Sequence, residues 1–417
     1  MTNLTEKVSK KDKLILGDLG RKLRAIAELP VQNETIKLWK ALNGLKPVRP
    51  MVMIDQLPWH ELNTDNELSL LTEDPFCREV ELNIRKQLYQ WKHFRVDSVV
   101  LPEIYCPLVI EGIDFGVNPD ESVAVGDPKN SVVGHFFEDC LKDEEALEKI
   151  KMPHIELNEP ETNRRFEILK ETFSGIIDVR KQGYQFNFHV WDEIVVRRGA
   201  ENLLLDLSLR PEFTHKVISR FSDFYLSMLD QMEEKGLLGF GFPTIHCTGA
   251  FSDELPAAGF NPDKPRAKDN WAYGAAQIFS TVSPAMHEEF EIEYAKKWFS
   301  KFGLGYYGCC EPLHKKIGII RKLPNIRKIS MSPWVDQEEG ALNIGKDYVF
   351  SRKTSPAYFS RESFDLQALL EDAKETKKIC VRSSSPLEFI LKDVSTVNYE
   401  PKRLETWAEG MMALVKK

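Results

Sequence analysis

The sequence predicts an α/β fold: a (β/α)8 TIM barrel with N-terminal helices and an insertion after strand two. The chain of 417 residues, 42% of them apolar, suits one elaborated barrel with a large buried core. Eight short apolar runs occur along it, and most are followed by amphipathic, helix-like stretches. One connection, 102–182, is too long for a single crossover, so we expect an insertion that covers the barrel mouth.

Each predicted strand is short, apolar and followed by a polar or proline-containing loop, as buried parallel strands are. Residues 201–235 carry apolar side chains at helical spacing with a break at Pro211, and Ser283-Pro284 opens a helix over 283–302. Residues 1–49 form an N-terminal helical extension in this prediction, and 50–417 form the barrel. The predicted strands cover 51–55, 97–101, 184–188, 237–240, 304–309, 328–331, 347–350 and 387–391.

Composition restricts the class of protein. The formal net charge of -8 argues against general nucleic-acid binding, which needs a basic face. No apolar run is long enough to span a membrane, and residues 1–13 lack the apolar core of a signal peptide. The seven cysteines are odd in number and scattered, which favours free thiols in a reducing cytoplasm.

Barrel enzymes place their sites at the carboxyl ends of the strands. Two such ends carry thiols and imidazole: His246-Cys247 after the fourth predicted strand, and Cys309-Cys310-Glu311 after the fifth. A thiol at a strand end can serve as a metal ligand or a nucleophile. We therefore expect these two ends to converge on one metal-dependent site. The structural alternatives are a buried core thiol for Cys309 and Cys310, and for His246 a hydrogen bond to a backbone carbonyl.

Other strand ends offer substrate-binding candidates. Trp59 and His60 follow strand one as an aromatic wall and a hydrogen-bond partner; a loop anchored by a buried Trp is an equal alternative. Trp191 and Asp192 after strand three have the same two interpretations. Arg352 and Lys353 after strand seven would bind an anionic group or form structural ion pairs.

The order of segments resembles the uroporphyrinogen decarboxylase superfamily, including its zinc-dependent corrinoid methyltransferases and O-demethylases. Ser283-Pro284 with Phe290 is similar to the family's Ser-Pro-x-x-Phe helix start, at a longer spacing. Cys310 lies where the methyltransferases have the Cys of His-x-Cys-Gly. Residues 350–356 resemble their Gly-Asn-x-x-Pro turn.

Three departures from the family modify what the resemblance implies. The loop over 55–61 has no arginine to grip an acidic tetrapyrrole, which disfavours porphyrinogen decarboxylation. Gly308 stands at the position of the ligand His. Lys392-Asp393 stands where the family has a third ligand, a cysteine after strand eight.

The resemblance implies zinc as a Lewis acid, which needs three protein ligands and an open position. We predict His246, Cys310 and Glu311 as those ligands. Glu311 or His60 would also act as the catalytic acid. Alternatives for the carboxylate or third ligand are Glu289, Glu293 and Asp393, with His314 and Cys309 as lesser options.

The expected function is transfer of a methyl group from a small methylated, methoxyaromatic-type substrate to cobalamin carried by a separate corrinoid-binding protein. The chain has no corrinoid-binding motif of its own, which is why a partner is implied. Both a monomer and a homodimer are compatible with the sequence. The alternatives are a metal-free lyase of the decarboxylase type, a methylcobalamin:thiol methyltransferase, and a non-catalytic binding barrel.

Overall fold

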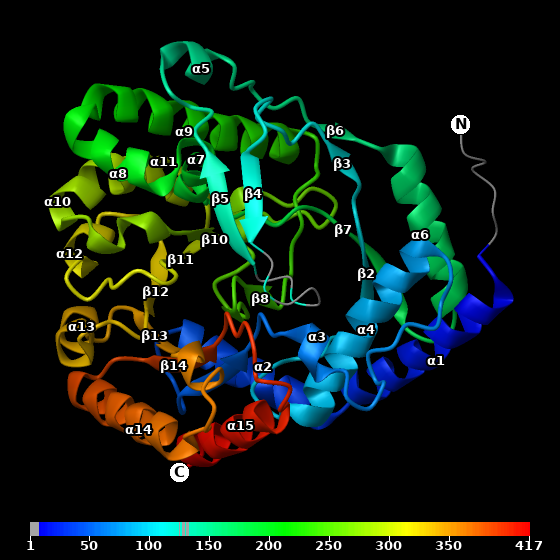
Figure 1. Ribbon diagram of the computed structural model, residues 1–417. Helices are drawn as coiled ribbons and strands as arrows, with labels where there is room; N and C mark the ends of the chain where they lie inside the picture. The colour runs from blue at the N-terminus through cyan, green and yellow to red at the C-terminus, as the bar shows by residue number, and fades with distance from the viewer. Residues whose placement is uncertain (1–7, 125, 127–129, 131–132) are drawn as a thin grey trace.

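The computed structural model describes residues 8–124, 126, 130 and 133–417. Its centre is a parallel sheet of six strands in the order β1-β14-β13-β12-β11-β10 (Figure 1). Strands that follow one another in the chain are therefore neighbours in the sheet, and β1 lies beside the last strand. This is the strand order of a (β/α) barrel. The strands are β1 (Met51–Ile54), β10 (Trp271–Gly274), β11 (Leu304–Tyr307), β12 (Ile326–Met331), β13 (Val349–Thr354) and β14 (Leu387–Leu391).

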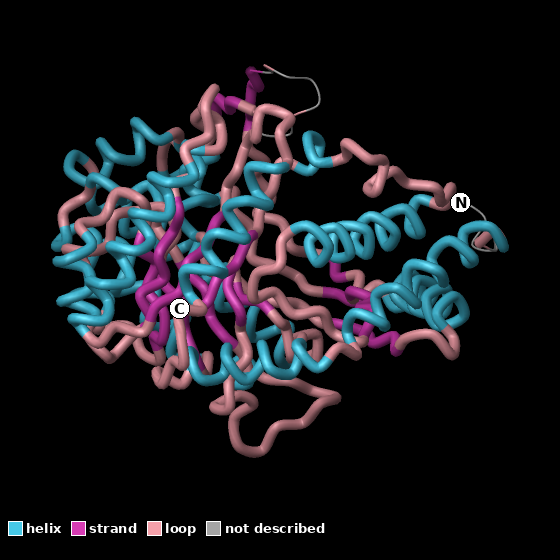
Figure 2. Tube along the Cα trace, turned by 90° about the horizontal axis from the view of Figure 1, so that it is seen from below, coloured by secondary structure: helices cyan, strands magenta, loops and turns pink. Residues whose placement is uncertain are grey.

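Helices surround the outer face of this sheet (Figures 1 and 2). Their buried faces carry large apolar side chains, such as Trp298 and Trp407, that pack into one continuous core around the strands. The helices on this side are α7 (Val190–Arg198), α8 (Ala200–Leu209), α9 (Pro211–Glu234), α10 (Pro284–His287), α11 (Glu293–Lys301), α12 (Ile317–Ile320), α13 (Gln337–Ile344), α14 (Leu366–Ser383) and α15 (Lys402–Val415).

The sheet continues beyond both of its edges through isolated contacts. Beside β10, parallel bridges join Phe188 to Gly274 and Tyr184 to Leu238. Beside β1, the Asp97 N–H donates to the Val52 carbonyl at 2.9 Å. The mixed α/β architecture is thus consistent with the predicted TIM-like barrel, although the described residues form no closed ring of paired strands.

Three predicted strands are wrong. Residues 184–188 form only two isolated bridges, from Tyr184 to Leu238 and from Phe188 to Gly274. Residues 97–101 form no strand, because Asp97 is held by side-chain contacts instead: it pairs with Arg49 at 2.6 Å and accepts the Val52 N–H at 2.8 Å. The segment 237–240 contributes only one bridge, and β10 takes the position beside β11. The sequence of β10, Trp-Ala-Tyr-Gly, is half Ala and Gly, which are depleted in strands, and this weakens its strand signal.

A second unit packs against one side of the barrel. Helices α1, α4 and α6 and the strand pair β2-β7 share their own apolar core, which includes Leu16, Ile84 and Phe173. Helix α2 lies instead beneath β1. The elements here are α1 (Lys10–Ala27), α2 (Pro30–Asn43), α3 (Trp59–Leu62), α4 (Pro75–His93), β2 (Glu103–Pro107), α6 (Glu159–Phe173) and β7 (Asp178–Gln182).

The remaining part of the long 102–182 connection projects over the front of the barrel (Figure 1). The Asn130 side chain donates to the Ser395 carbonyl at 3.3 Å, in the loop that follows β14. The insertion therefore touches the carboxyl end of the sheet. Its elements are β3 (Ile110–Glu111), β4 (Asp120–Ala124), β5 (Gly134–Glu138), α5 (Glu144–Glu148) and β6 (Glu156–Leu157).

A small hairpin, β8 (Thr244–Ile245) with β9 (Thr248–Gly249), enters the space enclosed by the sheet. Asn43 of α2 donates to the Gly249 carbonyl at 3.0 Å, and a Cβ at Gly249 would lie 2.3 Å from the Trp39 ring. The hairpin is therefore clamped at its base, and its tip, His246-Cys247, points along the barrel axis toward the carboxyl ends of the strands.

The inward-facing side chains along this hairpin form polar layers. Lowest, Lys328 pairs with Glu388 at 2.8 Å, both fully buried, and the Thr248 hydroxyl donates to Glu388 at 2.7 Å. Above them Lys353 contacts the Cys247 thiol at 3.2 Å. A lumen filled with ionic and hydroxyl groups is unusual for a barrel core and leads upward to the site described next.

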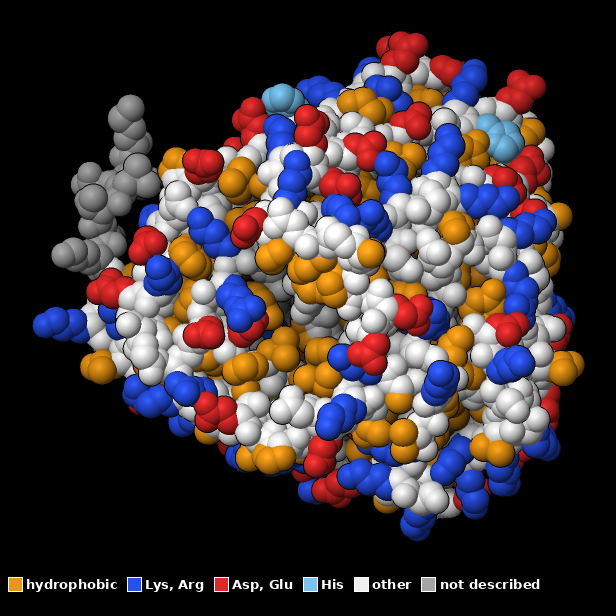
Figure 3. All heavy atoms as spheres, turned by 180° about the vertical axis from the view of Figure 1, so that it is seen from behind, with side chains coloured by type: hydrophobic (Ala, Val, Ile, Leu, Met, Phe, Trp, Pro, Cys, Tyr) orange, Lys and Arg blue, Asp and Glu red, His pale blue; other side chains and the backbone are white. Residues whose placement is uncertain are grey.

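Within the described residues, no helix has the length and apolar character needed to cross a lipid bilayer. The face shown in Figure 3 carries Lys, Arg, Asp and Glu side chains intermixed.

Candidate functional site

Five side chains meet at the carboxyl end of the sheet: His246, Cys309, Cys310, Lys392 and Asp393, called here the thiol cluster. The two cysteines follow β11, the Lys-Asp pair follows β14, and His246 is the tip of the β8-β9 hairpin. Lys392 and His246, 146 positions apart in the chain, thus meet at one point.

Unusual backbone conformations aim these side chains. His246 and Asp393 have positive φ angles, 52° and 57°, which non-glycine residues seldom adopt. Gly308 has φ 92°, and a Cβ there would lie 2.3 Å from Leu313 Cδ1. Gly308 therefore ends β11 in a sharp turn that a side chain would block.

This turn changes the expected facing of the cysteines. Regular strand alternation predicts that Cys309 and Cys310 point to opposite sides, but their Sγ atoms lie 3.5 Å apart. Cys309 is 2% exposed, whereas Cys310 is open to solvent. His246 Nε2 lies 3.5 Å from Cys309 Sγ, and Asp393 Oδ2 lies 3.6 Å from Cys310 Sγ.

The Lys392 ammonium lies among these groups. Its Nζ is 2.9 Å from Cys309 Sγ, 3.0 Å from His246 Nε2 and 3.1 Å from Asp393 Oδ2. An ammonium only donates, so His246 Nε2 must accept, which places the imidazole proton on Nδ1. The neutral tautomer with a lone pair on Nε2 is the form that ligates metals.

Charge is distributed unevenly between the two thiols. The hydrogen bond from Cys310 lowers the pKa of Cys309 to about 7, and the Lys392 charge acts in the same direction. Burial opposes both effects. The same hydrogen bond, together with burial, raises the pKa of Cys310. Cys309 is therefore the more acidic of the two thiols, and Cys310 is its hydrogen-bond donor.

The neighbouring cation and imidazole respond to the same fields. Burial alone would lower the pKa of Lys392, but the thiols of Cys247 and Cys309 outweigh it and raise that pKa. Burial and the charges of Lys392 and Lys353 lower the pKa of His246, which is therefore neutral. Its ring stacks on Tyr273 with centroids 4.1 Å apart.

Glu311 is fully buried and supports the turn. Its carboxylate accepts the Cys309 N–H at 2.8 Å and the Ala276 N–H at 3.3 Å. It thereby joins the loops that follow β11 and β10. Among the described residues the groups whose potential ligand atoms all lie within 4.8 Å are Cys309, Cys310 and Asp393; the Glu311 carboxylate is turned toward backbone instead.

Asp192, predicted to bind substrate, lies near this carboxylate. Burial and the Glu311 charge raise the pKa of Asp192 to about 6, opposed by a hydrogen bond from Gln277 at 3.2 Å. A carboxyl group with this pKa is partly protonated close to neutral pH. Asp192 thus has the property expected of a proton donor.

The other predicted site residues are dispersed. Trp191 is 1% exposed and packs on Phe279 in the core behind the site. Arg352 faces outward between β13 and α14, where it donates to the Ser332 carbonyl at 2.7 Å and pairs with Asp372. Lys353 faces the lumen one layer below the cluster.

The two aromatic residues after β1 lie to the side of the cluster. His60 lies 3.5 Å from Glu61 and packs edge-on to the Tyr399 ring. Trp59 is half-buried, with its ring against Tyr89 and under the Lys86 ammonium.

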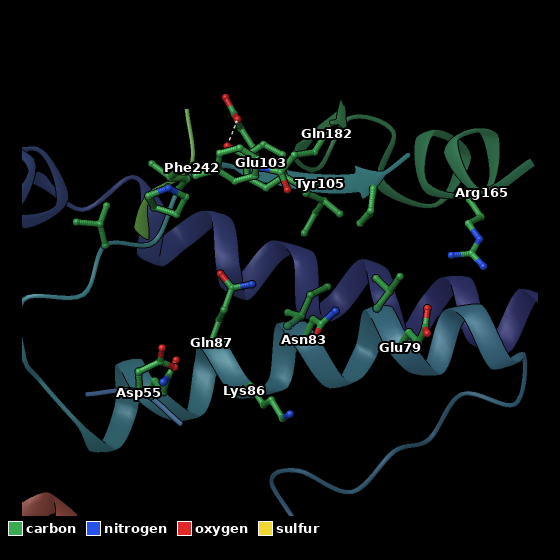
Figure 4. A pocket seen from close by; sticks show the side chains of 18 of the residues that line it. Asp55, Glu79, Asn83, Lys86, Gln87, Glu103, Tyr105, Arg165, Gln182 and Phe242 are labelled. Carbon is green, nitrogen blue, oxygen red and sulfur yellow. Dashed lines mark hydrogen bonds between the residues drawn. The ribbon is translucent and has the colours of Figure 1, made fainter. Parts of the chain in front are cut away.

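Trp59 and Asp55 also line a groove of about 530 Å³ between α4 and the β2-β7 pair. Figure 4 shows Asn83 and Gln87 pointing from α4 into this space, with Tyr105 and Gln182 above them. The groove begins at the end of β1, beside the barrel mouth. Its volume is that of a small-molecule site.

Sequence reasoning gave too little weight to two members of the cluster. Cys309 ranks as a lesser option by strand alternation, because the Gly308 turn is not visible in a strand pattern. Lys392 is noted only as the residue that stands where a cysteine is expected. A lysine at a ligand position was itself the available signal.

Comparison with known proteins identifies the fold. No protein-family profile matches the chain, and no curated protein is similar to it in sequence. Among solved structures, a methyltransferase from Methanosarcina mazei superposes with a TM-score of 0.50 at 11% sequence identity. The match covers 90% of this chain and 98% of that one. At this identity the similarity concerns the fold alone.

Proposed function

We propose that this protein is a methyltransferase whose reaction takes place at the thiol cluster. The observation that carries the proposal is the convergence of two thiols, an imidazole and a carboxylate at the carboxyl end of a barrel-like sheet. The fold it shares with a methyltransferase supports the same class.

The cluster fits zinc by its spacing. Zinc lies about 2.3 Å from sulfur and about 2.0–2.2 Å from nitrogen or oxygen, so tetrahedral neighbours lie about 3.4–3.8 Å apart. Three neighbouring pairs here are separated by 3.5, 3.5 and 3.6 Å. We propose Cys309, Cys310 and Asp393, whose potential ligand atoms all lie within 4.8 Å of one another, as the three residues that would hold the metal and leave one position open. His246, with Nε2 3.5 Å from Cys309 Sγ, is the alternative ligand. Bound there, zinc would supply a Lewis acid for a leaving oxygen or nitrogen.

The protein's own residues supply proton transfer and binding. Asp192 is the better-placed acid, because both Glu311 oxygens accept backbone N–H groups. A proton held on Asp192 would pass to the demethylated leaving group as its negative charge develops. Asp55 and Trp59 lead from the mouth into the groove, where the remainder of the substrate would bind.

The proposed donor is a small methylated molecule of the methoxyaromatic type, and the proposed acceptor is the cobalt of a corrinoid held by a separate protein. Ring contacts with Trp59 and Tyr105 in the groove favour an aromatic donor. Transfer in the opposite sense, from methylcobalamin to a thiol, would use the same cluster.

Purified protein is assayed for methyl transfer from a panel of methoxyaromatics to a reduced corrinoid protein, with zinc content measured in parallel. Cys309→Ala and Cys310→Ala should each abolish zinc and slow transfer at least about a hundredfold. Cys380→Ala is the matched control, since this buried cysteine lies in α14, remote from the cluster. Full transfer by Cys309→Ala, or none with any donor, would contradict the proposal.

The position of the Lys392 ammonium favours a second candidate, a metal-free lyase of the decarboxylase type. There the ammonium itself would stabilise the negative charge that develops on the substrate. Turnover of a carboxylated substrate by zinc-free protein would distinguish this candidate.

A further inference from the structure

We propose that the Lys392 ammonium and a divalent metal ion occupy the thiol cluster alternately, so that Lys392 limits metal binding. This inference rests on the metal-binding part of the proposed function. In this arrangement a side chain of the protein competes for its own metal site.

The competition follows from shared lone pairs. The ammonium has three protons to donate, and its three neighbours are Cys309 Sγ, His246 Nε2 and Asp393 Oδ2, at 2.9, 3.0 and 3.1 Å. A metal ion held by Cys309, Cys310 and Asp393 needs two of these same acceptors, the Cys309 sulfur and the Asp393 carboxylate. Two cations cannot share them, because a divalent ion at the centre of the cluster would lie within about 4 Å of the ammonium and be strongly repelled in a buried site.

A place for the displaced ammonium lies next to the cluster. Asp55 follows β1 beside β14, and its carboxylate accepts the N–H of Gln56 at 2.8 Å. Burial raises the pKa of the Asp55 carboxyl, and the Gln56 N–H together with the charges of Lys392 and Lys353 opposes this effect. Lysine's flexible four-carbon stem allows the head group to turn to this acid.

The lumen provides a matched control. Lys353 is 3% exposed, like Lys392 at 4%, and it contacts the Cys247 thiol, the Tyr306 hydroxyl and Ser351. It contacts none of the proposed ligands. Replacing Lys353 removes one buried positive charge from the same lumen and leaves the cluster's hydrogen bonds in place.

The test measures Zn²⁺ affinity of metal-free full-length protein at fixed pH, by competition with a chromogenic chelator. Lys392→Met should bind Zn²⁺ about tenfold tighter than the native protein, or more. Lys353→Met should change the affinity less than about threefold. Asp55→Asn should weaken binding, because the displaced ammonium loses its acceptor. Lys392→Gln replaces Lys392→Met if the latter does not fold.

A second readout is independent of zinc. In metal-free protein, Lys392→Met should slow alkylation of Cys309 by iodoacetamide, mapped by mass spectrometry, whereas Lys353→Met should not. Equal zinc affinities for native protein and Lys392→Met, or no binding by either, would overturn the inference. If Lys392→Met gained tenfold in zinc affinity while the native protein transferred no methyl group from any donor, the inference would stand and the proposed function would be contradicted.

Discussion

The two adjacent thiols lead to a quantitative prediction for Cys310→Ala. Cys310 donates to Cys309 across 3.5 Å, and this hydrogen bond is the largest contribution that lowers the pKa of Cys309 to about 7. A hydrogen bond to a charged acceptor contributes about 1.5 kcal/mol at the low end, which suits a weak S–H donor. Since one pKa unit is about 1.4 kcal/mol, the pKa of Cys309 should rise by about one unit in Cys310→Ala.

At pH 7 the thiolate fraction of Cys309 should then fall from about one half to about one tenth. The assay is a pH titration of thiolate ultraviolet absorbance in metal-free protein, with Cys309→Ser as the baseline for each background. Two results would refute the reasoning: a midpoint in Cys310→Ala equal to or below that of the native protein, or a native difference curve with no titration below pH 8.

Three further predictions concern the support of the site. Glu388→Leu should lower the free energy of unfolding by about 3–5 kcal/mol, because it leaves the buried Lys328 ammonium without its carboxylate. The double variant Glu388→Leu/Lys328→Met should recover most of that lost stability. Urea unfolding followed by Trp fluorescence measures both variants, and equal losses in the single and the double variant would contradict the prediction. The pKa of Asp192 is raised from 3.8 to about 6, so the native fold loses stability as the pH rises from about 4 to 6. Asp192→Asn should therefore be more stable than the native protein by up to about 3 kcal/mol at pH 8 and by little at pH 4. Unfolding at both pH values measures this, and a difference that does not depend on pH would count against it. Gly308→Ala should lower the melting temperature and displace Cys309, because φ 92° is strained for alanine and the new Cβ would collide with Leu313. A native-like melting curve together with an unchanged thiol titration would contradict this prediction.

The fold could be predicted from patterns that are local in the chain. Short apolar runs near β1 and β11 to β14 mark buried parallel strands, because strands covered on both faces need apolar residues at every position. The prediction failed where other interactions hold the backbone. Asp97 fixes its segment through Arg49, and β10 is held by packing of Trp271 and Tyr273 against the hairpin and β11.

The site was only partly predictable, because side-chain direction at a strand end depends on the turn that follows. His246 and Asp393 take positive φ angles, which no local sequence pattern predicts, although His and Asp adopt such angles more often than most non-glycine residues. The Gly308 turn brings Cys309 and Cys310 to one side against strand alternation. Glu311, which the sequence offers as a ligand, is committed to two backbone N–H groups.

The sequence by itself determined the barrel-like class and the strand ends that carry chemistry, since both depend on residue types within a few positions of each other. Tertiary structure alone decided which groups meet. Cys309 and His246 are 63 positions apart, and Lys392 and His246 are 146 apart, so only the clamped hairpin inside the sheet brings them together. The physical reason is that a buried cation must be matched by neighbouring lone pairs, and those come from whatever segments the fold packs around it.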